Sequence, residues 1–176
     1  MELEKQNEDL TTSDRGEARS KILAVEDYLM NLEGSLVGNN DRWPLKHSFS
    51  DGIYVREMFI PKGDIIVGKI HKHEHPNFLM KGTVNVFTEG GGQETIVAPC
   101  SMISAGGTKR TLYAETDLVW ITVHNNPDNI TDIPTLENLA VVDTYDQYDN
   151  FKALEEKKSK SLTTKLRKSL IKFLEV

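Results

Sequence analysis

The sequence predicts an all-β barrel or sandwich over residues 45–127, with helical segments before and after it. Short runs rich in β-branched and aromatic residues follow one another at close spacing, and turn signals at residues 61–64 and 90–92 separate them. Residues 83–87 alternate apolar and polar side chains, as a half-buried strand does. Helical periodicity is absent from this middle section, so the all-β class follows.

The expected strands follow in order along this section. Residues 52–60 form one strand, and residues 65–70 form the next, which runs into a cluster of histidines. Further strands are expected over residues 83–87, 94–97, 101–104, 110–113 and 118–124. Gly82 is expected at the turn that follows the histidine strand.

The segments outside the barrel are polar or helical. Residues 1–19 are acidic without apolar periodicity and are expected to be mobile. Residues 20–44 are expected to hold a helix over residues 20–33, which Gly34 ends, and a linker. Residues 128–176 form a C-terminal extension, with a short helix at 135–139, a short strand at 140–142 and a basic amphipathic helix from Lys152.

The C-terminal helix is expected to make protein contacts. Leu162, Leu166, Leu170 and Phe173 lie on one stripe, and basic residues cover the other side. An isolated helix of this length is marginal in water, so it needs a partner surface to persist. The chain is therefore expected to form a homo-oligomer or to join a larger protein assembly through this helix.

Length, charge and cysteine content limit the class of protein. The 176 residues suit one domain with peripheral extensions, and the single cysteine, Cys100, is expected to be a small buried side chain rather than a nucleophile. No secretory signal or membrane span is visible, so a cytoplasmic location is expected. The net charge of -6 combines a basic tail after residue 150 with an acidic remainder, which argues against nucleic-acid binding by the barrel.

Two motifs stand in the predicted barrel, and they resemble those of the cupin family. The first is His71-Lys72-His73-Glu74-His75 with Gly82 downstream, and the second is Ala105-Gly106-Gly107-Thr108-Lys109-Arg110. Together with the strings at residues 68–71, 98–99 and 118–122, they look like the single-domain cupins that are common in tailed-phage genomes. The resemblance implies a cupin double-stranded β-helix, or jelly roll, and for a phage protein a location in the host cytoplasm or the virion. It does not imply a particular activity.

The family's usual four metal ligands are incomplete in this sequence. Counting back from Gly82, the family's Glu position falls on His75, its second His on His71 and its first His on Lys69. Aligning on the literal HxH pair instead gives His71 and His73 and leaves no carboxylate at the expected distance. In both registers, Arg110 replaces the histidine of the second motif.

The clustered histidines form a candidate metal site. In an extended strand, side chains at i, i+2 and i+4 share one face, so His71, His73 and His75 are candidates to converge on one divalent transition metal such as Zn, Fe, Mn or Ni. Three imidazoles would leave coordination positions open. The alternative places these histidines at the surface or rim, and Arg110 would repel a cation if it pointed into the same pocket. His124 closes a predicted strand and could reach the barrel mouth, although a structural role is favoured for it.

A second candidate site follows from the second motif. The glycines, with Gly107 foremost, would let backbone N–H groups approach a ligand, and Lys109 and Arg110 can bind a carboxylate or phosphate. The alternative is a β-turn followed by a solvated basic pair. Nothing in the local sequence singles out Glu57 or Glu115 as a ligand or base.

Three functions stay open. One is a barrel that binds a metal or a small anionic ligand in its mouth without a stated activity. Another is a metal-dependent enzyme of the dioxygenase or isomerase type, which the missing second-motif histidine disfavours. The third is a structural or assembly protein, for example a virion component, whose helical extensions carry the contacts.

Overall fold

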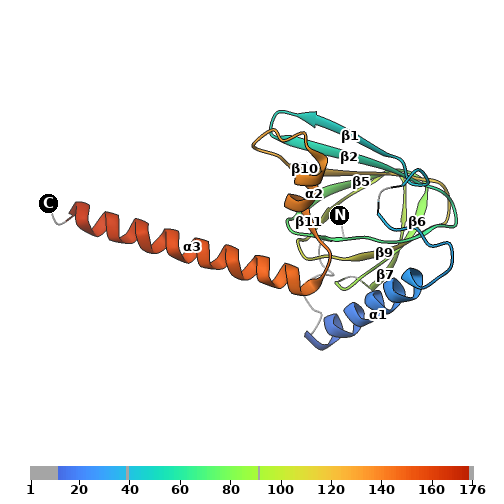
Figure 1. The fold of residues 1–176 in the computed structure, drawn as a ribbon, viewed down its shortest axis with the longest axis horizontal. Helices are drawn as coiled ribbons and strands as arrows, with labels where there is room; N and C mark the ends of the chain where they lie inside the picture. The colour runs from blue at the N-terminus through green and yellow to red at the C-terminus, as the bar shows by residue number, and fades with distance from the viewer. Residues whose placement is uncertain (1–11, 39, 91, 175–176) are drawn as a thin grey trace.

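The computed structural model describes residues 12–38, 40–90 and 92–174, and within them two antiparallel sheets form the barrel (Figure 1). The five-stranded sheet has the order β1-β2-β10-β5-β8, and the four-stranded sheet has the order β3-β9-β6-β7. Apart from the hairpins β1–β2 and β6–β7, successive strands of these two sheets lie in opposite sheets, as in the double-stranded β-helix that the sequence predicts. The strands are β1 (Leu45–Ser50), β2 (Ile53–Ile60), β3 (Ile65–Val67), β5 (His75–Lys81), β6 (Thr83–Thr88), β7 (Gly92–Val97), β8 (Cys100–Ser104), β9 (Arg110–Ala114) and β10 (Leu118–Asn125).

The core lies between the two sheets because alternate residues of each strand point inward. Leu118 and Trp120 of β10 face Leu112 and Ala114 of β9 from the opposite side of the same buried cluster. Cys100, expected to be a small buried side chain, is a free thiol that is only partly buried and packs at the edge of this core.

Gly82 occupies the turn between β5 and β6, as the sequence predicts. Its φ of 95° is in the left-handed region, and a Cβ there would lie 2.3 Å from the carbonyl oxygen of Asp117. Only glycine fits this close approach between the two sheets. No helix interrupts the described residues between Ile65 and Val97.

The predicted strand over residues 65–70 is divided in two. β3 ends at Val67, the Gly68 N–H donates to the Arg110 carbonyl oxygen at 2.9 Å, and β4 (Ile70–His71) pairs instead with β11 (Val141–Val142). The C-terminal extension therefore contributes a strand beside the histidine cluster. Its short helix α2 (Ile133–Ala140) begins at the Asp132 cap, in the place that the sequence predicts.

The N-terminal helix is longer at its start than predicted. α1 (Thr12–Met30) includes residues 12–19, which were expected to be mobile, and it ends before residue 33. Tertiary contacts explain the difference: Arg19 lies 4.3 Å from the centre of the Tyr145 ring, and Ile22 is fully buried against the barrel. Residues 1–11, the rest of the predicted mobile segment, lie outside the described residues.

The C-terminal helix α3 (Tyr145–Leu174) extends away from the barrel (Figure 1). Its first turns contact the barrel through Tyr145, Tyr148 and Phe151, whereas Leu162, Leu166 and Leu170 are about 60 % exposed. The helix predicted from Lys152 is present and begins earlier. No described helix is long and apolar enough to cross a membrane.

Candidate metal centre

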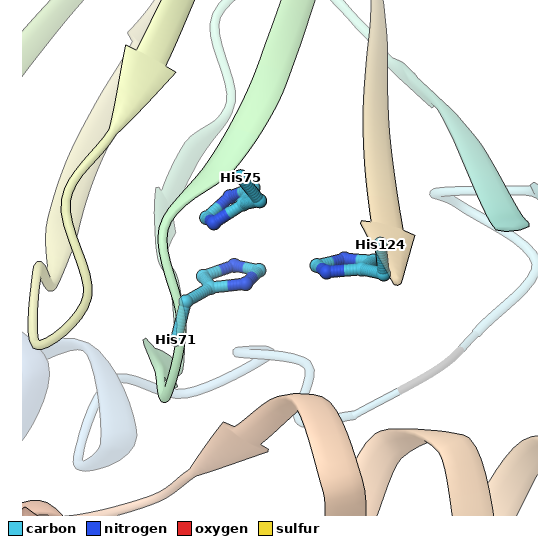
Figure 2. Close-up of side chains that lie close together, drawn as sticks. All are labelled: His71, His75 and His124. Carbon is cyan, nitrogen blue, oxygen red and sulfur yellow. The ribbon is translucent and has the colours of Figure 1, made fainter. Parts of the chain in front are cut away.

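Three histidines from three strands meet inside the barrel: His71 at the end of β4, His75 at the start of β5 and His124 near the end of β10 (Figure 2). One ring nitrogen of each lies within 4.8 Å of those of the other two. The three rings form a triangle, with centroid distances of 4.0 Å between His71 and His75, 5.0 Å between His75 and His124, and 5.3 Å between His71 and His124.

A bend in the chain brings His71 and His75 together. The Lys72 N–H donates to the Ala140 carbonyl oxygen at 2.8 Å, and the Gly107 N–H donates to the His71 carbonyl oxygen at 2.7 Å. These two contacts hold the chain between the end of β4 and its entry into the five-stranded sheet as β5. His71 and His75 therefore face each other across a bend rather than along one strand.

The prediction that His73 shares their face is wrong in its geometry, because residues 72–74 are not a strand. The His73 side chain is exposed, and its ring packs edge-on against Phe151 of α3 at a centroid distance of 5.3 Å. His73 is absent from the group of ligand atoms that meet in the described part of the chain.

His124 takes the place expected for His73. Leu118, Trp120, Thr122 and His124 alternate along β10, so the inward direction of Leu118 and Trp120 carries His124 inward as well. Sequence reasoning gave His124 a structural role because no second histidine lies near it. The alternation of inward and outward residues along the predicted strand is the pattern that places His124 on the inner face.

Two buried imidazole nitrogens of the group lack a partner. The His75 Nδ1–H donates to the His73 carbonyl oxygen at 3.1 Å, which leaves the lone pair of its Nε2 directed into the barrel. His75 Nε2 and His71 Nδ1 are buried and have no hydrogen bond within the described residues. A buried polar atom without a partner is costly, so both nitrogens are suited to bind an added group.

Burial keeps the three imidazoles neutral. It lowers the pKa of His71 from 6.5 to about 2 and that of His124 to about 4, and it lowers the pKa of His75 as well. The neighbouring histidines and the guanidinium of Arg56 act in the same direction on His71 and His124. Neutral imidazole is the form that binds a metal ion.

Arg110 points into the barrel from β9, beside the histidines. Its guanidinium donates to the Ser104 hydroxyl and lies 5.9 Å from the centre of the Trp120 ring. Its charge lowers the pKa of both His71 and His75. The expectation that Arg110 would oppose a cation in this pocket therefore agrees with its position.

Lys109 and Gly107 have structural contacts in place of the ligand contacts expected of them. Lys109 is 1 % exposed, and its Nζ lies 2.6 Å from Glu26 of α1 and 3.3 Å from the Asp143 carbonyl oxygen. The Gly107 N–H is used by His71, and a Cβ at Gly107 would lie 2.5 Å from the Tyr148 ring. The glycines of the second motif thus allow α3 to pack closely on the barrel.

The two glutamates that the sequence did not single out lie outside the histidine group. Glu115 accepts a hydrogen bond from Asn85 at 2.6 Å. Glu57 faces away from the inner residues Arg56 and Met58 of β2, because neighbouring residues of a strand point to opposite sides. The group therefore consists of imidazoles alone.

A cavity of about 850 Å³ is lined by His71 and His75 of the histidine group. Its wall combines residues from both sheets with the end of α1 and the segment that follows it. The part of the wall around the histidines and Arg110 includes Arg56, Met58, His71, His75, Asn77, Ser104, Arg110, Leu112 and Trp120.

Comparisons with known proteins identify similar solved structures, whereas no family model and no curated protein matches the chain. Ectoine synthase from P. lautus is 15 % identical with a TM-score of 0.47, over 61 % of this chain and 81 % of that one. Salicylate 1,2-dioxygenase from Pseudoaminobacter salicylatoxidans is 12 % identical with a TM-score of 0.46, over 74 % and 35 %. An RmlC-like cupin from Methanocaldococcus jannaschii is 10 % identical with a TM-score of 0.42, over 53 % and 89 %.

The two sheets and their strand orders give the chain a double-stranded β-helix fold, with helices added at both ends. Within the barrel, three neutral histidines could hold a metal ion.

Proposed function

We propose that this protein binds one divalent transition-metal ion through His71, His75 and His124, inside a cavity that also admits a small anionic ligand. The supporting observation is the pair of buried, unpartnered imidazole nitrogens on His71 and His75. His124 supplies the third nitrogen within the same 4.8 Å.

The donor set suits Zn, Fe, Mn or Ni. Imidazole nitrogen binds each of these ions, and three protein ligands leave coordination positions for water or a ligand. The lowered pKa values of His71 and His124 mean that no proton has to leave these rings at neutral pH before they bind. When bound, the ion would supply Lewis acidity or, for a redox-active metal, electron transfer at the open positions.

The positive charge of Arg110 and Arg56 supports a ligand of negative charge. A divalent cation held by neutral histidines beside two guanidiniums has no protein carboxylate in its group of ligands. An anion in the cavity would compensate this charge.

Metal content of the untagged chain tests the proposal. After exposure to each of the four ions and dialysis, mass spectrometry of the protein is expected to find one ion per chain. The His71→Ala/His75→Ala variant and the His124→Ala variant are expected to lose it, because the site keeps too few ligands. His73→Ala is the matched control and is expected to retain the ion. Loss of metal in His73→Ala with retention in His124→Ala would refute this ligand set.

A second function, assembly through α3, has its own supporting observation. The apolar stripe of Leu162, Leu166 and Leu170 is exposed in the single chain, on a helix that projects from the barrel. We propose that this stripe contacts a second copy of the chain. The resemblance of residues 63–124 to phage cupins supports a phage origin, with the protein acting in the host cytoplasm or the virion.

A further inference from the structure

We propose that the anion of the cavity is the carboxylate of a small organic acid, which Arg110 and Arg56 bind from opposite sheets beside the three histidines. This inference rests on the proposed function only in placing a metal ion beside the carboxylate. The two arginines and their surroundings make the carboxylate site by themselves.

Arg110 is a cation inside the barrel without a carboxylate partner. Among the described residues no carboxylate oxygen lies within 4.0 Å of its guanidinium, and its side-chain hydrogen bond goes to the neutral Ser104 hydroxyl. Burial lowers the pKa of Arg110 to about 10, and the Glu89 and Glu94 carboxylates offset only part of this effect. A carboxylate in the cavity would reduce the remaining cost and accept two parallel N–H bonds from the guanidinium.

Arg56 supplies a second cation from the facing sheet. It lies on the inner side of β2 with Tyr54 and Met58, opposite Thr122 of β10, and it lines the same cavity as Arg110. It has no ion pair within the described part of the chain.

Three carboxylates around the cavity are already paired with other cations. Asp64 is paired with Arg42 at 2.5 Å, and Glu26 is paired with Lys109 at 2.6 Å. Asp143 is paired with Lys69 at 3.1 Å. Glu33 and Glu137 also line the cavity, and Glu89 and Glu94 raise the pKa of Arg110 electrostatically, against the larger lowering by burial. Neither Arg56 nor Arg110 forms an ion pair within 4.0 Å with a carboxylate among the described residues, so both guanidiniums can still pair with a ligand.

A buried polar network holds Arg110 in position. Asn77, with 0 % exposure, donates from Nδ2 to the Ser104 hydroxyl oxygen at 2.5 Å and accepts from Trp120 Nε1 at 3.0 Å. The Ser104 oxygen thus accepts from both Asn77 and Arg110, which leaves its own proton free for an acceptor in the cavity. A ligand carboxylate can accept from this hydroxyl and from Arg110 at once.

The surroundings favour a carboxylate on a carbon skeleton over inorganic phosphate. Phosphate sites commonly use rows of free backbone N–H groups, but the Gly107 N–H is already donated to His71 and Tyr148 covers both glycines. The side chains of Trp120, Met58 and Leu112 provide an apolar wall next to the arginines. Such a wall suits the body of an organic acid.

Calorimetric titration of the full chain tests the proposal, in a zinc-loaded form and in a form stripped with a chelator. The probes are succinate and benzoate, their uncharged amides succinamide and benzamide, and inorganic phosphate. At least one carboxylate is expected to bind both forms, at least about tenfold more tightly than its amide, since charged hydrogen bonds account for the difference. Tighter binding of phosphate than of both carboxylates would overturn the choice of ligand class.

Arginine variants identify the residues that bind. Arg110→Gln is expected to weaken carboxylate binding about 10- to 100-fold, and Arg56→Gln about 10-fold, while Arg167→Gln on the exposed part of α3 has no effect. Arg110→Lys keeps the charge without the planar guanidinium and is expected to bind the carboxylate with intermediate affinity. This variant tests the role of Arg110 if Arg110→Gln does not fold. Equal affinity in the wild type and both folded glutamine variants would overturn the proposal.

The titrations also separate this inference from the metal centre. A wild-type chain that binds a carboxylate but takes up no metal would refute the metal centre and support the carboxylate site. A chain that takes up metal but binds neither carboxylate in either form would refute the carboxylate site alone. Arg110→Gln is expected to keep the wild-type metal content, because Arg110 is not a metal ligand.

Discussion

Burial gives the cavity histidines a chemistry that exposed histidines lack. His75 is 3 % exposed, and its one protein hydrogen bond fixes the proton on Nδ1 and leaves Nε2 free. His71 has an unpartnered Nδ1 in the same space. The fold keeps these imidazoles neutral, with free lone pairs, and this lowers its free energy of unfolding by an amount that can be measured.

The stability of the metal-free protein is expected to fall as the pH falls from about 7 to 5. The unfolded histidines take up protons near pH 6.5, whereas His71 and His124, with pKa values of about 2 and about 4, stay neutral in the native state. The unfolded state therefore binds more protons in this window, and the free energy of unfolding drops by up to about 2 kcal/mol for each histidine. Urea unfolding at pH 7.5 and pH 5 measures the change.

The His124→Asn variant separates this contribution from other titrating groups. Its free energy of unfolding is expected to fall less than that of the wild type between the same two pH values, because one buried neutral histidine is gone. An equal fall in both proteins would contradict the assignment.

Asn77 is expected to matter more for stability than its polarity suggests. Asn77→Ala removes the partner of Trp120 Nε1 and one donor to Ser104, and leaves the buried Trp120 N–H unsatisfied. We expect a loss of about 2–4 kcal/mol in the free energy of unfolding, measured in urea. Asn85→Ala, at a more exposed site of β6, is the control and is expected to cost about 1 kcal/mol or less. A cost for Asn77→Ala no larger than that of the control would contradict the network.

At the scale of elements, the strands with clear local patterns were predictable and the bend at the histidines was not. Residues 101–104, 110–113 and 118–124 form strands as expected, since alternation and turn residues are local properties. β4 ends where it pairs with Val141, and this pairing joins residues about seventy positions apart in sequence. The residues near His71 in the sequence do not indicate this pairing, so the sequence predicts an unbroken strand through His73.

The same long-range effect explains Lys109. A Lys-Arg pair after two glycines is typical of a solvated turn or an anion site. Lys109 is instead buried, because it pairs with Glu26 of α1, which lies 83 positions earlier in the sequence. Arg110, one residue on, keeps the inward direction of Leu112 and Ala114 along β9, which alternation does predict.

The ion pair of Lys109 and Glu26 is expected to hold α1 on the barrel. Glu26→Ala leaves a buried ammonium without its carboxylate, which costs about 3–5 kcal/mol. The free energy of unfolding and the hydrogen-exchange protection of α1 should both decrease. The control is Glu17→Ala on the same helix, whose pair with Lys21 is more than 60 % exposed and contributes about 0.5 kcal/mol or less. Unchanged protection of α1 in Glu26→Ala would contradict this role.

At the scale of the whole molecule, the projecting part of α3 is expected to join two copies of the chain. Burying Leu162, Leu166 and Leu170 against a partner would contribute several kcal/mol, at roughly 1.5–3 kcal/mol per side chain before ordering costs. Leu166→Glu/Leu170→Glu is expected to lower the mass measured by light scattering while the far-ultraviolet signal of the barrel stays unchanged.

Thr164→Glu, on the other side of the same helix, is the control and should keep the wild-type mass. If the wild type already has the mass of one chain, or if the leucine variant keeps the mass of the wild type, the assembly role of this stripe is excluded.

The two tryptophans of the chain, Trp43 and Trp120, both line the cavity. Trp120 lies beneath Arg110 and donates to Asn77, and Trp43 donates to Asp64 at 2.7 Å. The tryptophan fluorescence of the protein therefore originates at the wall of the space where a ligand would lie. A paramagnetic ion near the histidines would quench this emission, and an aromatic acid near Arg110 would shift it. Tryptophan emission of the unmodified chain can therefore be used to detect binding of either group in the barrel.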